Sequence, residues 1–266
     1  MTARTRKRTM VVLISAVAAG LAVWAAIGLG VRVQDAVEQD QIFERLRKTS
    51  LAKAVTDLGS GRPQRGEEEV SLSSAASGHD IAALREENPD CIGWISIEGT
   101  VLDYPVMQTV EEPEYYLKRN FDGEHNDHGV PFLDARCHVG TADHLIIYGH
   151  NMADGTMFSV LHKYAQKSYW EEHPVITFET VEGVSQYRVA AVMRVSGVAY
   201  ETQWSIYNCI SLNDVEFEEM VEQLSQGALY HTGVVPVYGD ELLTVSTCES
   251  LYSQSNDRLV VVAVKQ

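Results

Sequence analysis

Cys248 is the residue of this 266-residue chain best placed for nucleophilic chemistry. It follows the β-prone run 242–247 and precedes the polar segment 249–257. A cysteine at the end of a strand and beside a loop can be reached by a substrate. A lone cysteine is, however, more often a buried thiol that only fills a core. Its position alone therefore leaves both interpretations open.

A histidine and an arginine could complete an acyl-transfer site around this thiol. Such a site needs a base or a cation that favours the thiolate, and a donor that stabilises the oxyanion. His150 follows the apolar run 145–148, and Arg258 opens the last apolar run, 259–264. If the two C-terminal strands pair, Cys248 and Arg258 share one rim of the sheet, where a guanidinium stays charged and offers fixed donors. Each residue alone is more often structural, but the three together predict catalysis by a thiol.

The acidic balance of the chain bears on its partners and on this thiol. The chain has 21 Lys+Arg against 37 Asp+Glu, a formal charge of −16, whereas a nucleic-acid binder needs a basic face. We therefore expect no nucleic-acid partner. Glu249 is next to Cys248 and Asp257 is next to Arg258, and negative neighbours disfavour a thiolate. We predict that Cys248 reacts slowly near neutral pH.

Seven or eight strands and few helices are expected to position these residues. The strand candidates are 93–97, 100–102, 130–133, 145–148, 175–180, 187–195, 242–247 and 259–264. The first two are expected to form a hairpin around Glu98-Gly99. So many strands in fewer than 190 residues predict a mainly β fold, a closed or nearly closed β-barrel. Peripheral helices are expected at 79–87, 156–165 and 214–224, the last with the spacing of a capping box at Asn213 and Glu216.

The first 78 residues are expected to hold the globular part at a membrane. Residues 1–9 form a basic tail, and residues 10–31 are uncharged, long enough as a helix to cross a hydrocarbon core of roughly 30 Å. The basic tail places the amino terminus in the cytoplasm and the catalytic domain outside the cell. A cleaved signal peptide is the alternative, although its apolar region is usually shorter. Residues 32–78 are expected to form a juxtamembrane helix and a linker, followed by a catalytic domain over 79–266.

Histidines and acids between residues 122 and 144 raise the question of a metal site. They are Asp122, His125, Asp127, His128, Asp134, Cys137, His138 and His144. No HExxH motif, paired CxxC motif or EF-hand order is present among them. We therefore interpret 122–129 as a solvated loop and expect neither a metal nor another cofactor. The spacing of Cys91, Cys137 and Cys209 indicates no disulfide connectivity.

Several motifs together resemble those of class B sortases, membrane-anchored cysteine transpeptidases of Gram-positive bacteria. The run 244–248 is similar to the sortase signature T-L-x-T-C, with Val245 in place of the usual leucine. The likeness to class B rests on Gly93-Trp94-Ile95, Tyr148-Gly149-His150-Asn151-Met152 and Asn256-Asp257-Arg258 before an apolar strand. The helix expected at 214–224 also fits class B. The resemblance covers about residues 79–266 and is specific as a set.

The resemblance implies an eight-stranded sortase β-barrel and a triad of His150, Cys248 and Arg258. Cys248 would attack the carbonyl of a threonine in the carboxy-terminal sorting motif of a surface protein, and an amine of a peptidoglycan precursor would resolve the thioacyl enzyme. His150 would protonate the leaving amine and deprotonate the incoming one. Arg258 would stabilise the oxyanion, together with the backbone N–H of Glu249. The resemblance makes three residues substrate-binding: Ser246 and Thr247, along the groove, and Glu249, through that N–H.

Three other functions stay open from the sequence. A pilin-polymerising sortase would use a lysine in place of the wall amine. A membrane-tethered interaction domain would keep the fold without catalysis. A hydrolytic thiol peptidase would pass the acyl group to water.

Overall fold

The computed structural model describes residues 33–51, 78–196, 204–251 and 256–266, with a few further helical positions between 21 and 30. The chain divides into two compact units, Met1–Gln41 and Ile42–Gln266. Most of the expected membrane span 10–31 and nearly all of the expected linker lie outside the described residues. Among the residues that are described, no helix is both long enough and apolar enough to cross a bilayer.

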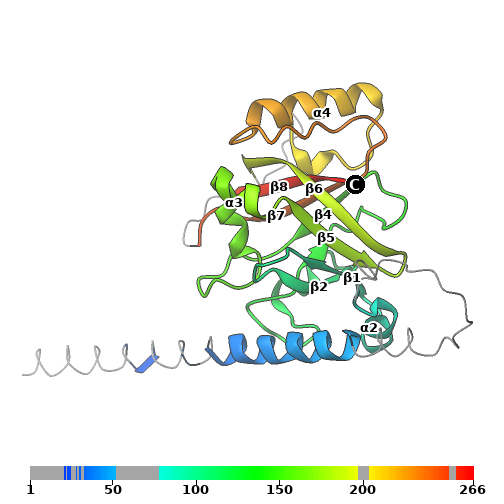
Figure 1. Ribbon diagram of the computed structural model, residues 1–266. Coiled ribbons are helices and arrows are strands. Elements are labelled where there is room, and N and C mark those ends of the chain that lie inside the picture. Colours follow the sequence, from blue (N-terminus) through cyan, green and yellow to red (C-terminus); the bar gives the residue numbers. More distant parts are fainter. Residues whose placement is uncertain are drawn as a thin grey trace, which may run out of the picture. The chain divides into compact units, whose positions relative to one another are not determined.

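Eight strands close into a barrel in the order β1-β2-β3-β4-β7-β8-β6-β5 (Figure 1). The strands are β1 (Cys91–Ser96), β2 (Asp103–Met107), β3 (Phe132–Leu133), β4 (His144–Tyr148), β5 (Val175–Thr180), β6 (Gly183–Ser196), β7 (Leu242–Cys248) and β8 (Asp257–Lys265). In a closed barrel each strand has a neighbour on both sides. The prediction of a mainly β, closed, eight-stranded barrel is confirmed.

The neighbours of β7 position the rim of the barrel. β4 runs parallel to β7 and pairs with it up to Tyr148 and Ser246. β8 runs antiparallel on the other side of β7, with Cys248 directly opposite Arg258. All residues of β7 before Cys248 are buried. Because residues on both faces of β7 are buried, a run rich in apolar and β-branched residues, without polar alternation, is the pattern that fits it.

The turn between β1 and β2 differs from the hairpin expected around Glu98-Gly99. Residues 100–102 belong to the turn, and β2 begins only at Asp103. The Thr100 hydroxyl donates to the carbonyl of Ile97 and accepts from the N–H of Leu102, at 2.9 and 3.1 Å, which stabilises the longer turn. β2 contains Pro105, opposite Trp94 of β1. A proline argues against a strand in a sequence pattern because it has no N–H to donate to a neighbouring strand. The structure accommodates Pro105 because β2 pairs with β3 only at Met107.

In the described residues from 78 onward, six helical segments surround the barrel. They are α2 (Ile81–Glu87), the 3₁₀ helices η1 (Tyr115–Lys118), η2 (Phe158–Ala165) and η3 (Ile206–Asn208), α3 (Lys167–Glu172) and α4 (Asp214–Gly227). The capping box of Asn213 and Glu216 at the start of α4 is confirmed. α4 lies along the outside of the barrel, where it contacts β6 (Figure 1).

The helix that covers residues 33–51 becomes part of the barrel unit from Ile42 onward. Phe43 and Leu46 are buried, and the Phe43 ring packs on Tyr104 at 5.0 Å between centroids. The compact unit that contains the barrel therefore includes the part of this helix from Ile42 onward. The apolar spacing of this helix is recognisable, but the pattern does not identify the surface of β2 that covers it.

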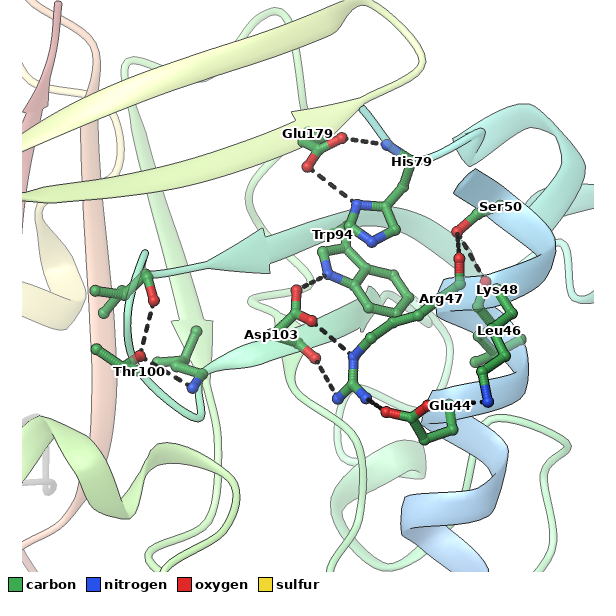
Figure 2. A network of polar contacts seen from close by, with 12 residues as sticks. Glu44, Leu46, Arg47, Lys48, Ser50, His79, Trp94, Thr100, Asp103 and Glu179 are labelled. Atoms are coloured by element: carbon green, nitrogen blue, oxygen red, sulfur yellow. Dashed lines mark hydrogen bonds and ion pairs between the residues drawn. The ribbon is translucent and has the colours of Figure 1, made fainter. Parts of the chain in front are cut away.

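A chain of polar contacts joins this helix to β2 and β1 (Figure 2). The Arg47 guanidinium pairs with the Asp103 carboxylate at 2.7 Å and with Glu44 at 2.6 Å. The other oxygen of Asp103 accepts from the indole N–H of the buried Trp94 at 2.7 Å. The His79 ring stacks on Trp94 with centroids 4.1 Å apart. A continuous series of ion pairs, hydrogen bonds and one ring stack therefore covers β1 and β2, on the side of the barrel opposite β7 in strand order.

Candidate active site

The barrel brings the three predicted catalytic residues to one rim. Cys248 ends β7 and is partly exposed, with Arg258 as its pairing partner in β8. His150 follows β4 by two residues on the other side of β7. All three line one cleft of about 560 Å³. The expectation that Cys248 and Arg258 would share a rim is confirmed.

His150 is held by a backbone carbonyl and not by a carboxylate. Its Nε2 lies 2.7 Å from the carbonyl oxygen of Leu117 in η1. A carbonyl can only accept, so Nε2 carries the hydrogen and Nδ1 of the neutral ring has the free lone pair. Burial lowers the pKa of His150 below the ordinary histidine value, although the bond to Leu117 opposes this shift. The imidazole is therefore neutral near pH 7 and able to take up a proton at Nδ1.

Gly129 buttresses the same Leu117 carbonyl. It has a positive φ of +60°, and a Cβ at this position would lie 2.4 Å from the Leu117 oxygen. Non-bonded carbon and oxygen atoms do not come this close, so only glycine fits here without a shift of the backbone. The loop that contains Gly129 is less solvated than the sequence indicated, because Asn126 and His128 in it are buried. The Nε2 atom of His128 has a partner in this buried position, the Asp154 carboxylate at 2.7 Å.

The peptide that follows Cys248 is bonded on both of its edges. Its carbonyl oxygen lies 3.1 Å from Asn151 Nδ2 and 3.0 Å from His162 Nε2. The N–H of Glu249 donates to the Asp257 carbonyl at 2.9 Å. That N–H would have to give up this bond before it could donate to an oxyanion, the role suggested for it by the resemblance.

Arg258 is the cation paired with Cys248 across the strands, and another arginine pairs with Glu249, the acid next to Cys248 in sequence. Arg258 is half-buried, and its guanidinium donates to the Asp257 carbonyl at 3.2 Å. The Glu249 side chain pairs with Arg194 of β6 at 2.7 Å. Arg194 thus offsets the charge that was expected to oppose a thiolate at Cys248. The sequence offers no signal for this pair, because the two residues are 55 positions apart.

Ser246 and Thr247 lie beneath the cleft with their hydroxyls already bonded. Both are buried in β7, although both residues also contribute to the lining of the cleft. The Ser246 hydroxyl is 2.8 Å from the Tyr207 hydroxyl, and the Thr247 hydroxyl donates to the Gly149 carbonyl at 2.8 Å. These bonds tie β7 to η3 and to the segment after β4.

The cleft also contains a polar group that the sequence did not reveal. Arg136 forms a two-bond pair with Asp134, at 2.9 and 2.7 Å, and donates to the Tyr207 carbonyl at 2.9 Å. The Tyr148 hydroxyl donates to Asp134 at 2.8 Å and its ring stacks on Tyr207. Although burial opposes ionisation, the bonds from Arg136 and Tyr148 lower the pKa of Asp134. The two-residue spacing of Asp134 and Arg136 is the only local signal.

The buried histidines and cysteines outside the cleft have structural partners in the described part of the chain. His144 opens β4, is buried, and bonds to the Cys209 carbonyl and to the Thr244 hydroxyl. All four cysteines are free thiols, and all except Cys248 are buried. Within the described residues no three His, Cys, Asp or Glu side chains gather as metal ligands would.

A thiol, an imidazole and a guanidinium around one cleft are the groups of a cysteine-dependent acyl-transfer enzyme. A family model for the sortase domain matches residues 95–266. Sortase B of Staphylococcus aureus (strain NCTC 8325 / PS 47) is 32% identical over 182 residues, which cover 68% of this chain and 72% of the relative. Sortase B of Listeria monocytogenes serovar 1/2a is 31% identical over 185 residues, with the same coverage of 68% and 72%.

Solved structures agree with the sequence relatives. A Staphylococcus aureus sortase B–substrate complex superimposes with a TM-score of 0.62 at 30% identity, covering 70% of this chain and 84% of that one. A crystal structure of Staphylococcus aureus sortase B gives a TM-score of 0.68 at 26% identity, covering 86% of this chain and 97% of that one. The chain belongs to the sortase family of transpeptidases, and its relatives place it in class B.

Proposed function

We propose that this protein is a membrane-anchored transpeptidase that attaches surface proteins to the cell wall. The observation that carries the proposal is the shared cleft, in which Cys248 faces Arg258 across a strand pair and His150 lies beside the neighbouring strand. The solved substrate complex of Staphylococcus aureus sortase B supports a substrate-binding role for a protein of this fold.

The first half-reaction transfers an acyl group to the thiol. Cys248 Sγ attacks the carbonyl carbon of a threonine in the sorting motif while His150 Nδ1 takes up the thiol proton, and Arg258 stabilises the oxyanion through its N–H groups. When the peptide C–N bond breaks, His150 Nδ1 gives its proton to the leaving amine. The products are a thioester on Cys248 and the peptide beyond the threonine.

The second half-reaction reverses these roles. The amine of a peptidoglycan precursor attacks the thioester while His150 Nδ1 accepts its proton. The C–S bond breaks, and Cys248 leaves as the thiolate, which takes the proton back from His150 Nδ1 and so restores the thiol and the neutral imidazole. Because Nε2 stays bonded to the Leu117 carbonyl, the same nitrogen serves as acid and then as base.

The proposed placement rests on the amino-terminal sequence. The uncharged run 10–31 follows a basic tail, which favours an uncleaved helix with a cytoplasmic amino terminus and an external catalytic domain. Sorting-signal proteins and wall precursors meet at that outer face.

The test is a product analysis with a library of sorting peptides and several amines, including glycine and lysine peptides. We expect mass spectrometry to show the acyl part joined to an amine, and a Cys248→Ala protein to form no product. Ser225→Ala, at an exposed position of α4 and not among the residues that line the cleft, is the matched control. Transfer by the Cys248→Ala protein would overturn the proposal, and transfer to water alone would identify a thiol peptidase instead. Capture by lysine peptides only would identify a pilin-type nucleophile.

A further inference from the structure

Cys248 stands where one side of β7 has lost its strand partner. The β4–β7 pairing ends at Tyr148 and Ser246, and the last backbone bond on that side runs from the Gly149 N–H to the Ser246 carbonyl at 3.1 Å. Carbonyls two residues apart along a strand point to the same side. The Cys248 carbonyl therefore points toward β4, beyond the end of the β4 backbone.

Two side chains take the place of the missing strand. Asn151 comes from the segment after β4, and His162 comes from η2. Their nitrogens lie 3.1 and 3.0 Å from the Cys248 carbonyl oxygen. Because the carbonyl only accepts, both side chains donate, and they use the two lone pairs of that oxygen.

The opposite edge of the same peptide is bonded to β8. The Glu249 N–H donates to the Asp257 carbonyl at 2.9 Å, one step beyond the pairing of Cys248 with Arg258. The peptide between Cys248 and Glu249 therefore has its orientation fixed from both sides. That orientation sets where the Cys248 side chain lies relative to Arg258, and small misplacements of a reacting group reduce rates strongly.

We propose that Asn151 and His162 are positioning residues for the nucleophile, acting together through the Cys248 carbonyl oxygen. Neither residue takes part in bond making. The expected effect on turnover rests on the proposed function. The orientation of the Cys248–Glu249 peptide group does not, and that orientation can be measured without a substrate.

The arrangement predicts that each donor can substitute for the other. Loss of one side chain leaves the carbonyl with one of its two side-chain donors, whereas loss of both removes every side-chain donor that orients it. The effect of the double substitution should therefore exceed the product of the two single effects.

The first measurement is amide hydrogen exchange at Glu249, followed by NMR in the full chain. His162→Phe and Asn151→Leu keep the side-chain shape and remove the donors, and the double variant removes both. We expect exchange to rise about twofold in each single variant and by more than about tenfold in the double variant. A second double variant, with His162→Gln in place of His162→Phe beside Asn151→Leu, keeps one N–H donor and should restore the protection of the Glu249 amide to the level of a single variant.

The second measurement separates kcat from KM in the transpeptidation assay. The double variant should lower kcat by about tenfold or more with KM nearly unchanged, and His162→Gln should recover most of the rate. His173→Phe is the control, because the His173 ring bonds to the Glu98 carbonyl at 2.9 Å in the same way but away from the cleft.

The outcomes divide clearly. Faster exchange at Glu249 in an otherwise inactive protein would support the positioning role and defeat the proposed function alone. Unchanged exchange in the double variant would overturn the inference. So would a loss of kcat that His162→Gln fails to rescue, or one that His173→Phe reproduces.

Discussion

The two ends of the β4–β7 pair each carry a histidine, and the two histidines are held in opposite ways. At one end, His144 Nδ1 bonds to the Cys209 carbonyl and Nε2 bonds to the Thr244 hydroxyl. At the other end, His150 Nε2 bonds to the Leu117 carbonyl. Because carbonyls only accept, His144 carries its hydrogen on Nδ1 and His150 carries its hydrogen on Nε2.

The comparison shows what turns a histidine of this barrel from a structural group into a reactive one. His144 is buried with both ring nitrogens occupied, so it can exchange a proton only at the expense of its bonds. His150 is half-buried, lines the cleft, and has one ring nitrogen held by a carbonyl. One fixed nitrogen orients the ring, and the other is left for chemistry.

The largest expected effect is the loss of turnover in His150→Gln. The glutamine amide can still donate to the Leu117 carbonyl, so the ring is replaced without removing that bond, but no group that titrates near neutral pH remains. We expect kcat to fall by roughly 10³-fold and the melting temperature to stay nearly unchanged. Steady-state kinetics and thermal unfolding measure the two quantities. A variant that keeps a tenth of the activity would contradict the assignment of His150 as acid and base.

His144→Gln should have the reverse effect, on stability and its pH dependence. Burial lowers the pKa of His144 from 6.5 to about 4. Between these values the unfolded chain binds a proton that the native protein does not, so the native state becomes less stable as the pH falls. We expect the wild type to lose about 2 kcal/mol of unfolding free energy between pH 7 and pH 5 through this group.

Urea unfolding at both pH values, in wild type and variant, checks this expectation. His144→Gln should remove most of that pH-dependent loss, although it also lowers stability at pH 7, and it should keep transpeptidase activity. His125→Gln, at an exposed position, is the control. An equal pH dependence in wild type and His144→Gln would show that other groups dominate the acid response.

The fold was predictable where the sequence pattern is local. β7 is mostly apolar and β-branched, β8 contains the continuous apolar run 259–264, and the Asn213 and Glu216 spacing marks the start of α4. The pattern misplaces β2 because Pro105 argues against a strand at 103–107. The docking of Phe43 could not be foreseen, because a helical pattern indicates a buried face without naming the surface that covers it.

The three reactive residues of the site were predictable from the sequence, but the groups that hold them in place were not. Cys248, His150 and Arg258 each stand at the end of a recognisable strand, and pairing of the last two strands brings two of them together. The groups that hold them are different in kind. Leu117 acts through its backbone oxygen and His162 through contact with a carbonyl, and neither role leaves a mark on the sequence.

The smallest expected effect tests the Leu117 carbonyl, which no side-chain substitution can remove. In Gly129→Ala the new Cβ would lie 2.4 Å from the Leu117 oxygen and 2.8 Å from the Tyr116 oxygen, so this backbone must move. We expect kcat to fall about tenfold. Nitrogen NMR of His150 should show the Nε2–H form in wild type and a mixture of both neutral forms in the variant.

Gly155→Ala is the control that isolates this contact. Gly155 also has a left-handed backbone, with φ +86°, but nothing lies within 4 Å of a Cβ there. Both substitutions therefore share the left-handed strain of about 1 kcal/mol for an L-residue, and only Gly129→Ala disturbs the acceptor of His150. If the two variants lose the same activity, backbone strain explains the loss. If instead Gly129→Ala alone shifts the hydrogen of His150 from Nε2 toward Nδ1, the carbonyl bonded to each histidine determines which of its ring nitrogens carries the hydrogen.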